Sequence, residues 1–143
     1  MTEIAFHFNV PDKLGYACRL LRKAYRSAAE VGVLGPAPLL AELDRALWSF
    51  DQLEFIPHAS TKQSGGVVGR YTRVWLAPSA ADVPHHGVLV NLGDEVPEGF
   101  ERFARLIEIV STDERDRQAA RRRWRHYGDR GYTIQRHEVG AAS

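Results

Sequence analysis

The chain has 143 residues, of which 44% are hydrophobic and 26% charged, with one cysteine and a formal net charge of +1. This length suits a single domain with its own core, and the composition excludes a disordered chain or one held together by disulfides. The near-neutral total charge is also atypical of a dedicated nucleic-acid-binding domain.

The first third of the chain predicts strands that alternate with helices. "EIAFHFNV" (3–10) is rich in β-branched and aromatic residues and is typical of a strand. Asp12 can cap a following helix, in which apolar residues recur at helical spacing from Leu14 onward. A short apolar run (30–35) predicts a second strand, and "PAPLLAELDRALW" (36–48) predicts a second amphipathic helix.

The rest of the chain continues this alternation after a polar, glycine-rich stretch. Strands are predicted at 73–77, 87–91 and 106–111, with a short helix within 97–106. A helix begins near Ser111, and "YTIQRHEV" (132–139) predicts an edge segment. The alternation indicates an α/β domain with a largely parallel sheet. We expect one domain over 1–139 and a disordered tail at 140–143.

Several features of the sequence bear on the cellular compartment of the protein. The N-terminal segment lacks the basic and apolar regions of a signal peptide, and no apolar stretch is long enough for a membrane helix. Cys18 has no second cysteine to pair with, which favours a reducing compartment. The sequence thus predicts a cytoplasmic protein without a membrane partner.

No motif for catalysis, a cofactor or a metal is recognisable. "GVLGPAPLL" lacks the glycine pattern of a phosphate-binding loop, and its prolines remove backbone donors. The six histidines do not have metal-ligand spacing, and Cys18 lies on the apolar face of its helix. The prediction is no catalytic residues, no cofactor and no metal. An α/β enzyme with an unrecognised site stays an alternative.

The strongest signal is "RQAARRRWRHYGDRGY" (117–132), within a region that holds eight of the sixteen arginines of the chain. At 100° per residue, Ala120 and Tyr127 face inward, and Trp124 lies at the border of the inward and outward faces. The outward row is formed by Arg117, Arg121 and Arg125. The wheel leaves Arg122, Arg123 and His126 outside this row, and they are interpreted as solvated.

Three interpretations of this basic helix compete. Trp124 could belong to the core beneath a solvated surface, or the helix could bind nucleic acid directly. In the third interpretation, tryptophan and arginines form a socket for an acidic ligand with an apolar tip. The near-neutral total charge weakens the nucleic-acid interpretation and favours the socket.

A second cluster follows the helix at 36–48. Large apolar residues gather in "LDRALWSFDQLEFIPH" (43–58), and they include Trp48, Phe55 and Ile56. Some of them could belong to the core. So many at a helix end and loop also predict an apolar patch that binds a second protein.

Three blocks of the sequence closely resemble one family. "FHFNVPDKLGYACRLLRKAY" (6–25), "LDRALWSFDQLEFIPH" (43–58) and "ARRRWRHYGDRGYTIQRHE" (120–138) are similar, in order and spacing, to the chi subunit of bacterial DNA polymerase III. The resemblance implies a single three-layer, Rossmann-like α/β domain with a largely parallel (mixed) sheet, helices on both faces and no catalytic activity. It also implies an accessory subunit of the clamp loader that acts at the bacterial replisome during DNA replication.

The resemblance further implies two partners and a site for each. One partner is the acidic, phenylalanine-ended C-terminal tail of the single-stranded-DNA-binding protein, so contact with nucleic acid would be mostly indirect. The other is the psi subunit, and an iron–sulfur helicase is a further partner implied at the same surface. The site for the tail falls on Val110, Arg117, Arg121, Trp124 and Arg125, and the site for psi falls on Trp48, Phe55 and Pro57.

Overall fold

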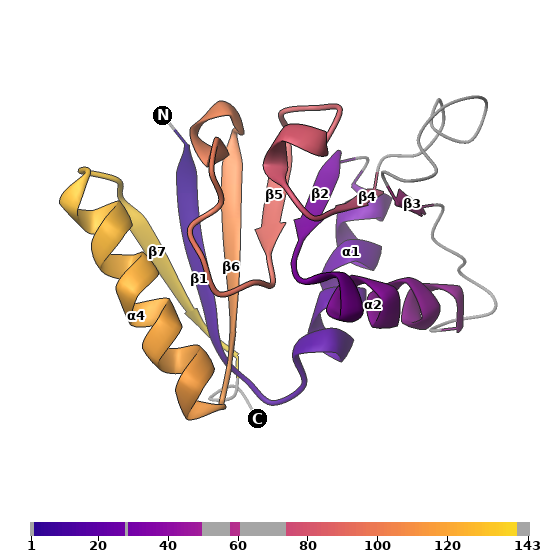
Figure 1. Ribbon diagram of the computed structural model, residues 1–143, viewed down its shortest axis with the longest axis horizontal. Coiled ribbons are helices and arrows are strands. Elements are labelled where there is room, and N and C mark those ends of the chain that lie inside the picture. The colour runs from indigo at the N-terminus through magenta and orange to yellow at the C-terminus, as the bar shows by residue number, and fades with distance from the viewer. Residues whose placement is uncertain (1, 28, 50–57, 61–73, 140–143) are drawn as a thin grey trace.

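The described residues of the computed structural model, 2–27, 29–49, 58–60 and 74–139, form one seven-stranded sheet. The strand order is β3-β4-β2-β5-β6-β1-β7, and every pairing among the described residues is parallel. Figure 1 shows α4 alongside the β7–β1 half of the sheet and α1 and α2 at the other half. The expectation of a largely parallel α/β sheet is confirmed. The tail at 140–143 lies outside the described residues.

Most elements follow the sequence-based expectations, but no strand was predicted at 58–60, within the polar stretch. The strands are β1 (Glu3–Val10), β2 (Val31–Leu34), β3 (His58–Ser60), β4 (Val74–Ala77), β5 (Val88–Asn91), β6 (Arg105–Ser111) and β7 (Ile134–Glu138). The helices are α1 (Lys13–Arg26), α2 (Ala37–Ser49) and α4 (Glu114–Asp129), with short 3-10 turns η2 (Ala80–Asp82) and η3 (Phe100–Arg102). The short helix predicted within 97–106 is therefore a single 3-10 turn.

α1 begins and buries its apolar face as its sequence predicts. The side chain of Asp12 accepts a hydrogen bond from the backbone N–H of Gly15 at 3.1 Å, which satisfies one of the free donors of the first turn. Ala17, Cys18 and Leu21 are buried against the sheet. Burial raises the pKa of the Cys18 thiol, and the nearby Asp12 carboxylate adds to this rise.

The alternation of side chains along the strands divides the core into two halves, so the fold has three layers. On one face of the sheet, Ile107 and Ile109 of β6 pack with α1 and α2. On the other face, Leu106 and Val110 of the same strand pack with α4 and the 3-10 turns. Phe6 of β1 joins the second half of the core beneath α4. The α4 half of the core carries the site described below.

β1 changes course near its end, and this change shapes the edge of the sheet. Asn9 has a positive φ of 61°, and the pairing of β1 with β6 shifts register between His7 and Val10. Asn tolerates this left-handed conformation better than most residues other than glycine. The side-chain amide of Asn9 lies 3.4 Å from the Glu138 carboxylate on β7. The bulge thereby holds the ends of β1 and β7 together below α4.

The opposite face of β1 carries a partly buried histidine. Nδ1 of His7 lies 2.5 Å from the Tyr16 hydroxyl, and its ring contacts that of His137 with centroids 4.9 Å apart. Burial, and then the positive charges of His137, Arg105 and Lys23, lower the pKa of His7 from 6.5 to about 4. His7 is therefore neutral at physiological pH, and its Nδ1 can accept a hydrogen bond from the Tyr16 hydroxyl.

Acidification should destabilise the fold between pH 6.5 and about 4. In this window the unfolded chain binds a proton at His7 that the folded chain does not, so the free energy of unfolding falls as the pH falls. His7→Gln removes this proton uptake and keeps an acceptor for Tyr16. Urea unfolding across the window should show a smaller loss of stability for His7→Gln than for the unchanged chain. Equal losses would show that His7 does not govern this sensitivity.

Candidate functional site

The N-terminus of α4 is anchored by two aspartates. Asp113 caps the helix by accepting hydrogen bonds from the backbone N–H groups of Arg115 at 2.8 Å and Asp116 at 3.4 Å. Asp116 accepts the backbone N–H of Ser111 at 2.7 Å and pairs with the Lys13 ammonium at 3.2 Å. Burial alone would raise the pKa of Asp116, but these partners outweigh it and hold the pKa below its usual value. The first turn of α4 is thereby tied to β6 and α1.

A buried polar network fixes the middle of α4 against the sheet. Glu108 of β6 is fully buried and pairs with the Nε of Arg123 at 3.0 Å. The same carboxylate accepts hydrogen bonds from the Tyr127 hydroxyl at 2.5 Å and from the Asn91 amide at 3.0 Å. Nη1 of Arg123 also donates to the backbone carbonyl of Asp94 at 3.0 Å. The interpretation of Arg123 as a solvated residue is wrong: only 1% of its surface is exposed.

The pKa values of Glu108 and Tyr127 are set by burial and by the groups that surround the Glu108 carboxylate. Burial raises the pKa of Glu108, while Arg123 and the hydrogen bonds from Tyr127 and Asn91 act against that rise. Burial and the Glu108 carboxylate also raise the pKa of Tyr127, so its hydroxyl keeps its proton and donates. A buried charge is tolerated only when it is paired, so Arg123 must face β6. This requirement sets the rotation of α4 about its axis.

With this rotation, one side of α4 forms a groove with the edge of the sheet. The groove has a volume of about 330 Å³, at the lower end of the range for ligand pockets. Its lining comes from β1, β6, α4 and β7: Phe6, Phe8, Asn9, Val110, Arg117, Ala120, Arg121, Trp124, Arg136 and Glu138. Strands and a helix hold all of these side chains, so the groove has a rigid frame.

The apolar part of the groove is built on aromatic contacts. The rings of Phe6 and Trp124 lie with centroids 5.0 Å apart, and Val110 is buried at 3% exposure. The Arg136 guanidinium lies 5.3 Å from the centroid of Phe8 and 5.9 Å from that of Trp124. Such cation–π contacts hold a guanidinium against the rings while its edge stays available to donate hydrogen bonds.

The charged part of the groove is the pair of arginines on the first half of α4. The side chains of Arg117 and Arg121 are more than half exposed, and both lie near the same carboxylate. Glu114 is 3.9 Å from Nη1 of Arg117 and 3.6 Å from Nη1 of Arg121. Exposed pairs at these distances contribute at most about 1 kcal/mol each. Both guanidinium groups can therefore exchange Glu114 for another carboxylate at little cost.

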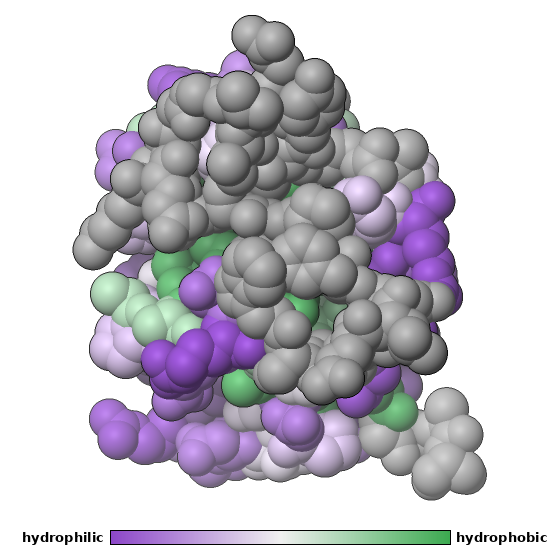
Figure 2. All heavy atoms as spheres, turned by 90° about the vertical axis from the view of Figure 1, so that its right-hand side faces the viewer, coloured by the Kyte–Doolittle hydropathy of each residue, from purple (hydrophilic) through white to green (hydrophobic). Residues whose placement is uncertain are grey.

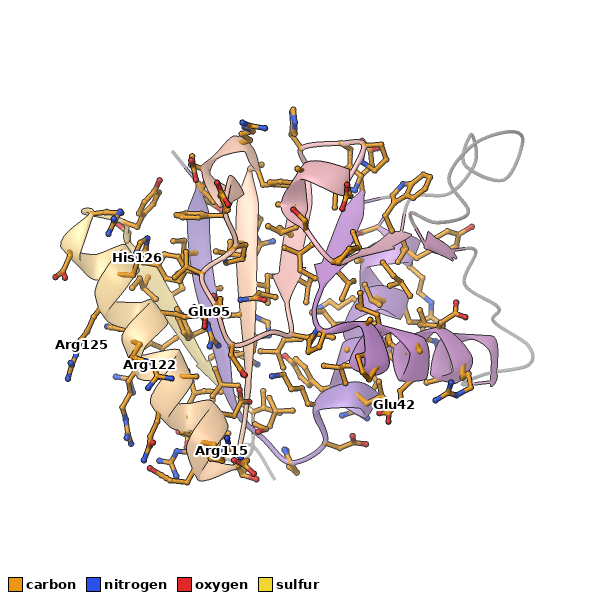
Figure 3. All side chains as sticks on the ribbon, in the orientation of Figure 1. Glu42, Glu95, Arg115, Arg122, Arg125 and His126 are labelled. Atoms are coloured by element: carbon orange, nitrogen blue, oxygen red, sulfur yellow. The ribbon has the colours of Figure 1, made fainter. Side chains whose placement is uncertain are left out.

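The structure brings together four of the five residues assigned to the tail site. Val110, Arg117, Arg121 and Trp124 all line the groove. Arg125 does not line it, and Figure 3 shows its side chain projecting from α4 into solvent. Trp124 is partly buried, which combines two interpretations that the sequence left apart: it packs on the core and also forms a wall of the groove.

The second predicted site falls outside what is described. Phe55 and Pro57 lie outside the described residues. Trp48 belongs to α2, but its side chain is not described.

Apart from Val110, sequence reasoning missed the sheet side of the groove. Phe6 and Phe8 alternate with His7 along β1, so their shared face could be read from the sequence. The place of Arg136 could not, because it depends on the register in which Phe6 lies opposite Arg136 across the β1–β7 pair. In the described part of the chain, no group of three metal-ligating side chains converges, and no helix has the length and hydropathy to span a membrane.

Fold and groove together define a three-layer, Rossmann-like α/β domain with a basic, aromatic-lined groove beside its edge strand. A family model described as "DNA polymerase III chi subunit, HolC" matches residues 1–135. A DNA polymerase III subunit chi of Pseudomonas aeruginosa is 34% identical over 145 residues, which cover 97% of this chain and 98% of that protein. One of Haemophilus influenzae is 26% identical, with 87% and 85% covered. The chain belongs to the DNA polymerase III chi subunit family.

Membership settles the general role of the chain. It is an accessory subunit of DNA replication, and this role implies protein partners within the DNA polymerase III holoenzyme.

The buried ion pair gives a direct test of what positions the groove. Arg123→Ala should lower the free energy of unfolding by about 3–5 kcal/mol, because it leaves the Glu108 carboxylate buried without its cation. Arg122→Ala is the matched control, since it removes the neighbouring, exposed arginine and should change stability by less than about 0.5 kcal/mol. Urea denaturation followed by circular dichroism measures both. A small loss for Arg123→Ala would mean that the pair does not fix α4.

Proposed function

We propose that this chain links the psi subunit of the clamp loader to the C-terminal tail of the single-stranded-DNA-binding protein, as a non-catalytic subunit in the bacterial cytoplasm. The observation that carries the proposal is the composition of the groove. Its apolar wall of Phe6, Val110 and Trp124 adjoins a rim of arginines. This combination suits an acidic peptide that ends in a large apolar residue.

Each part of the groove has a counterpart in such a tail. An aromatic side chain can pack between Val110 and Trp124, where the surface is already apolar. Arg117 and Arg121 can donate paired hydrogen bonds to carboxylates. Arg136 adds a third guanidinium from the sheet side of the groove, opposite the two on α4. Carboxylates could thus be held from both sides of the apolar wall.

The proposed tail site therefore differs from the one implied by resemblance alone. It keeps Val110, Arg117, Arg121 and Trp124 and adds Arg136. Arg125 is left out, because it does not line the groove.

The proposed psi site involves the end of α2 and the residues that follow it in the sequence. The resemblance assigns it to Trp48, Phe55 and Pro57, which follow or end α2. Figure 2 views the molecule from the side of α2, and hydrophobic side chains of described residues show left of its centre, among polar ones. Apolar surface of this kind favours a protein partner. An iron–sulfur helicase would use the same surface, whereas the tail would use the groove, so two partners could bind at once.

Two adjacent arginines of α4 test the groove. Arg121→Ala should weaken binding of an acidic, phenylalanine-ended tail peptide by about 1.5–3 kcal/mol, because a charge-assisted hydrogen bond is lost. Arg122→Ala should cost only a few tenths of a kcal/mol, because its charge lies outside the groove and salt screens it. Calorimetry with the peptide measures both affinities.

The comparison of Arg121→Ala with Arg122→Ala controls for the loss of positive charge. The two variants remove the same charge at neighbouring positions, so long-range attraction changes almost equally in both. Equal losses of affinity would mean that the peptide is held by a diffuse field, and the proposed groove site would be wrong.

Phe55 tests the proposed psi surface. Phe55→Ala should weaken binding to the psi subunit by about 2 kcal/mol, because truncation of a central aromatic anchor removes a large apolar contact. Binding of the tail peptide should not change, which provides the control for correct folding. Unchanged affinity for psi in a variant that still binds the peptide would contradict the assignment.

A further inference from the structure

The outer face of α4 carries a second set of arginines that the groove does not use. Arg115, Arg122 and Arg125, the outer arginines, are exposed, and Figure 3 shows them projecting from the helix into solvent. With Arg117 at zero, Arg122 lies at about 140° around the helix and Arg125 at about 80°. Neither they nor Arg115 line the groove. α4 therefore has two basic faces.

These arginines differ from the others of α4 in having no carboxylate partner. Arg123 is paired with Glu108, and Arg117 and Arg121 lie near Glu114. Among the described residues, the outer arginines form no ion pair. Their positive charge is thus not neutralised within the described part of the fold, and it remains available to an anionic partner.

The residues around the outer arginines indicate what kind of anion fits. The neighbouring positions on this face of α4 hold Gln118, His126 and Asp129, and none of them is apolar. A peptide partner is normally anchored by a buried aromatic or aliphatic side chain, and this face has no place for one. A basic surface without an apolar anchor suits a partner that repeats its charge at regular intervals. The phosphate backbone of a nucleic acid is such a partner.

The spacing of the outer arginines agrees with such a partner. Ten residues separate Arg115 from Arg125, which corresponds to about 15 Å along the helix axis. About four phosphates of one DNA strand cover that length in a duplex. We propose that the outer face of α4 contacts the DNA phosphate backbone, without regard to sequence, beside the groove. As a replication subunit, the chain works where DNA is present.

The number of contacts sets how strong this interaction is. Three neutralised phosphates give a salt slope of about −2 on single strands and nearly −3 on duplex DNA. Affinity for single strands then falls roughly 20-fold between 50 and 200 mM salt. Such binding is weak at physiological salt and takes effect when another contact holds the chain close to DNA, because tethering raises the effective concentration. The proposal goes beyond the groove function and does not depend on it.

The test is direct binding of the intact chain to fluorescent DNA. Anisotropy is measured with an oligothymidine of about 20 nucleotides and with a duplex of equal length, between about 20 and 200 mM salt. The triple variant Arg115→Gln, Arg122→Gln, Arg125→Gln should bind about tenfold or more weakly at low salt and lose most of the salt dependence. Gln preserves helix propensity, so α4 should stay folded.

A matched control removes the same charge elsewhere. Arg19, Lys23 and Arg102 are also exposed, lie outside α4 and form no ion pair among the described residues. Their triple replacement by Gln should keep the affinity within about threefold. Binding of the acidic tail peptide should be the same in both triple variants. Failure of the groove function would abolish peptide binding and leave these DNA results unchanged.

Four results would overturn the proposal. The first is no binding by the unchanged chain even at the lowest salt. The second is an equal loss in the two triple variants, which would mean a response to net charge alone. The third is a loss of peptide affinity in the outer-arginine variant of more than about tenfold, beyond what three screened charges explain, which would assign this face to the peptide. The fourth is a strong preference for single strands, since the outer face of α4 has no tryptophan, tyrosine or phenylalanine to stack on bases.

Discussion

The ion pair between Glu108 and Arg123 is the constraint on which the arrangement of α4 depends. A carboxylate on the inward face of a central strand is costly to bury, and the cost is offset only by a cation and further donors at contact distance. Arg123 meets this requirement only when α4 presents one particular side to the sheet. The directions of all other side chains of the helix follow from this one choice.

As a result, arginines that lie close together in the sequence of α4 have different roles. Arg123 is structural, because it neutralises Glu108. Arg117 and Arg121 turn toward the edge strand and line the groove. Arg115, Arg122 and Arg125 turn to solvent without ion pairs in the described structure. One helix thus supplies a core residue, a groove and an outer surface.

Much of this arrangement could be predicted from the sequence, because local patterns determine it. The alternation of strands and helices, the parallel sheet and the inward positions of Ala120 and Tyr127 follow from periodicity alone. The burial of Arg123 could also have been inferred. The helical wheel places it close to Tyr127, and alternation along 106–111 places Glu108 on the same face as Leu106 and Val110. A buried glutamate needs a cationic partner, and Arg123 was the one in reach.

Other features could not be predicted, because they depend on pairing between distant segments. Arg136 reaches the groove only because β7 lies beside β1 in one register. Whether Arg125 faces the groove depends on the rotation of α4 about its own axis. The helical wheel gives this rotation only to within the angle between one or two residue positions. Val110, which lines the groove, was assigned to the site through the resemblance rather than through periodicity.

Glu114 gives the groove a property that its lining alone does not show. Its carboxylate lies between the two guanidinium groups of the rim, so in the free protein it occupies the position of an internal competitor. The first carboxylate of an incoming ligand displaces Glu114 from an exposed contact worth at most about 1 kcal/mol, which lowers the net gain of that step. Selectivity must then come from what Glu114 cannot imitate: additional charges along the ligand and an apolar group that fills the space beside Trp124. We therefore expect the groove to discriminate against small carboxylates, which supply neither.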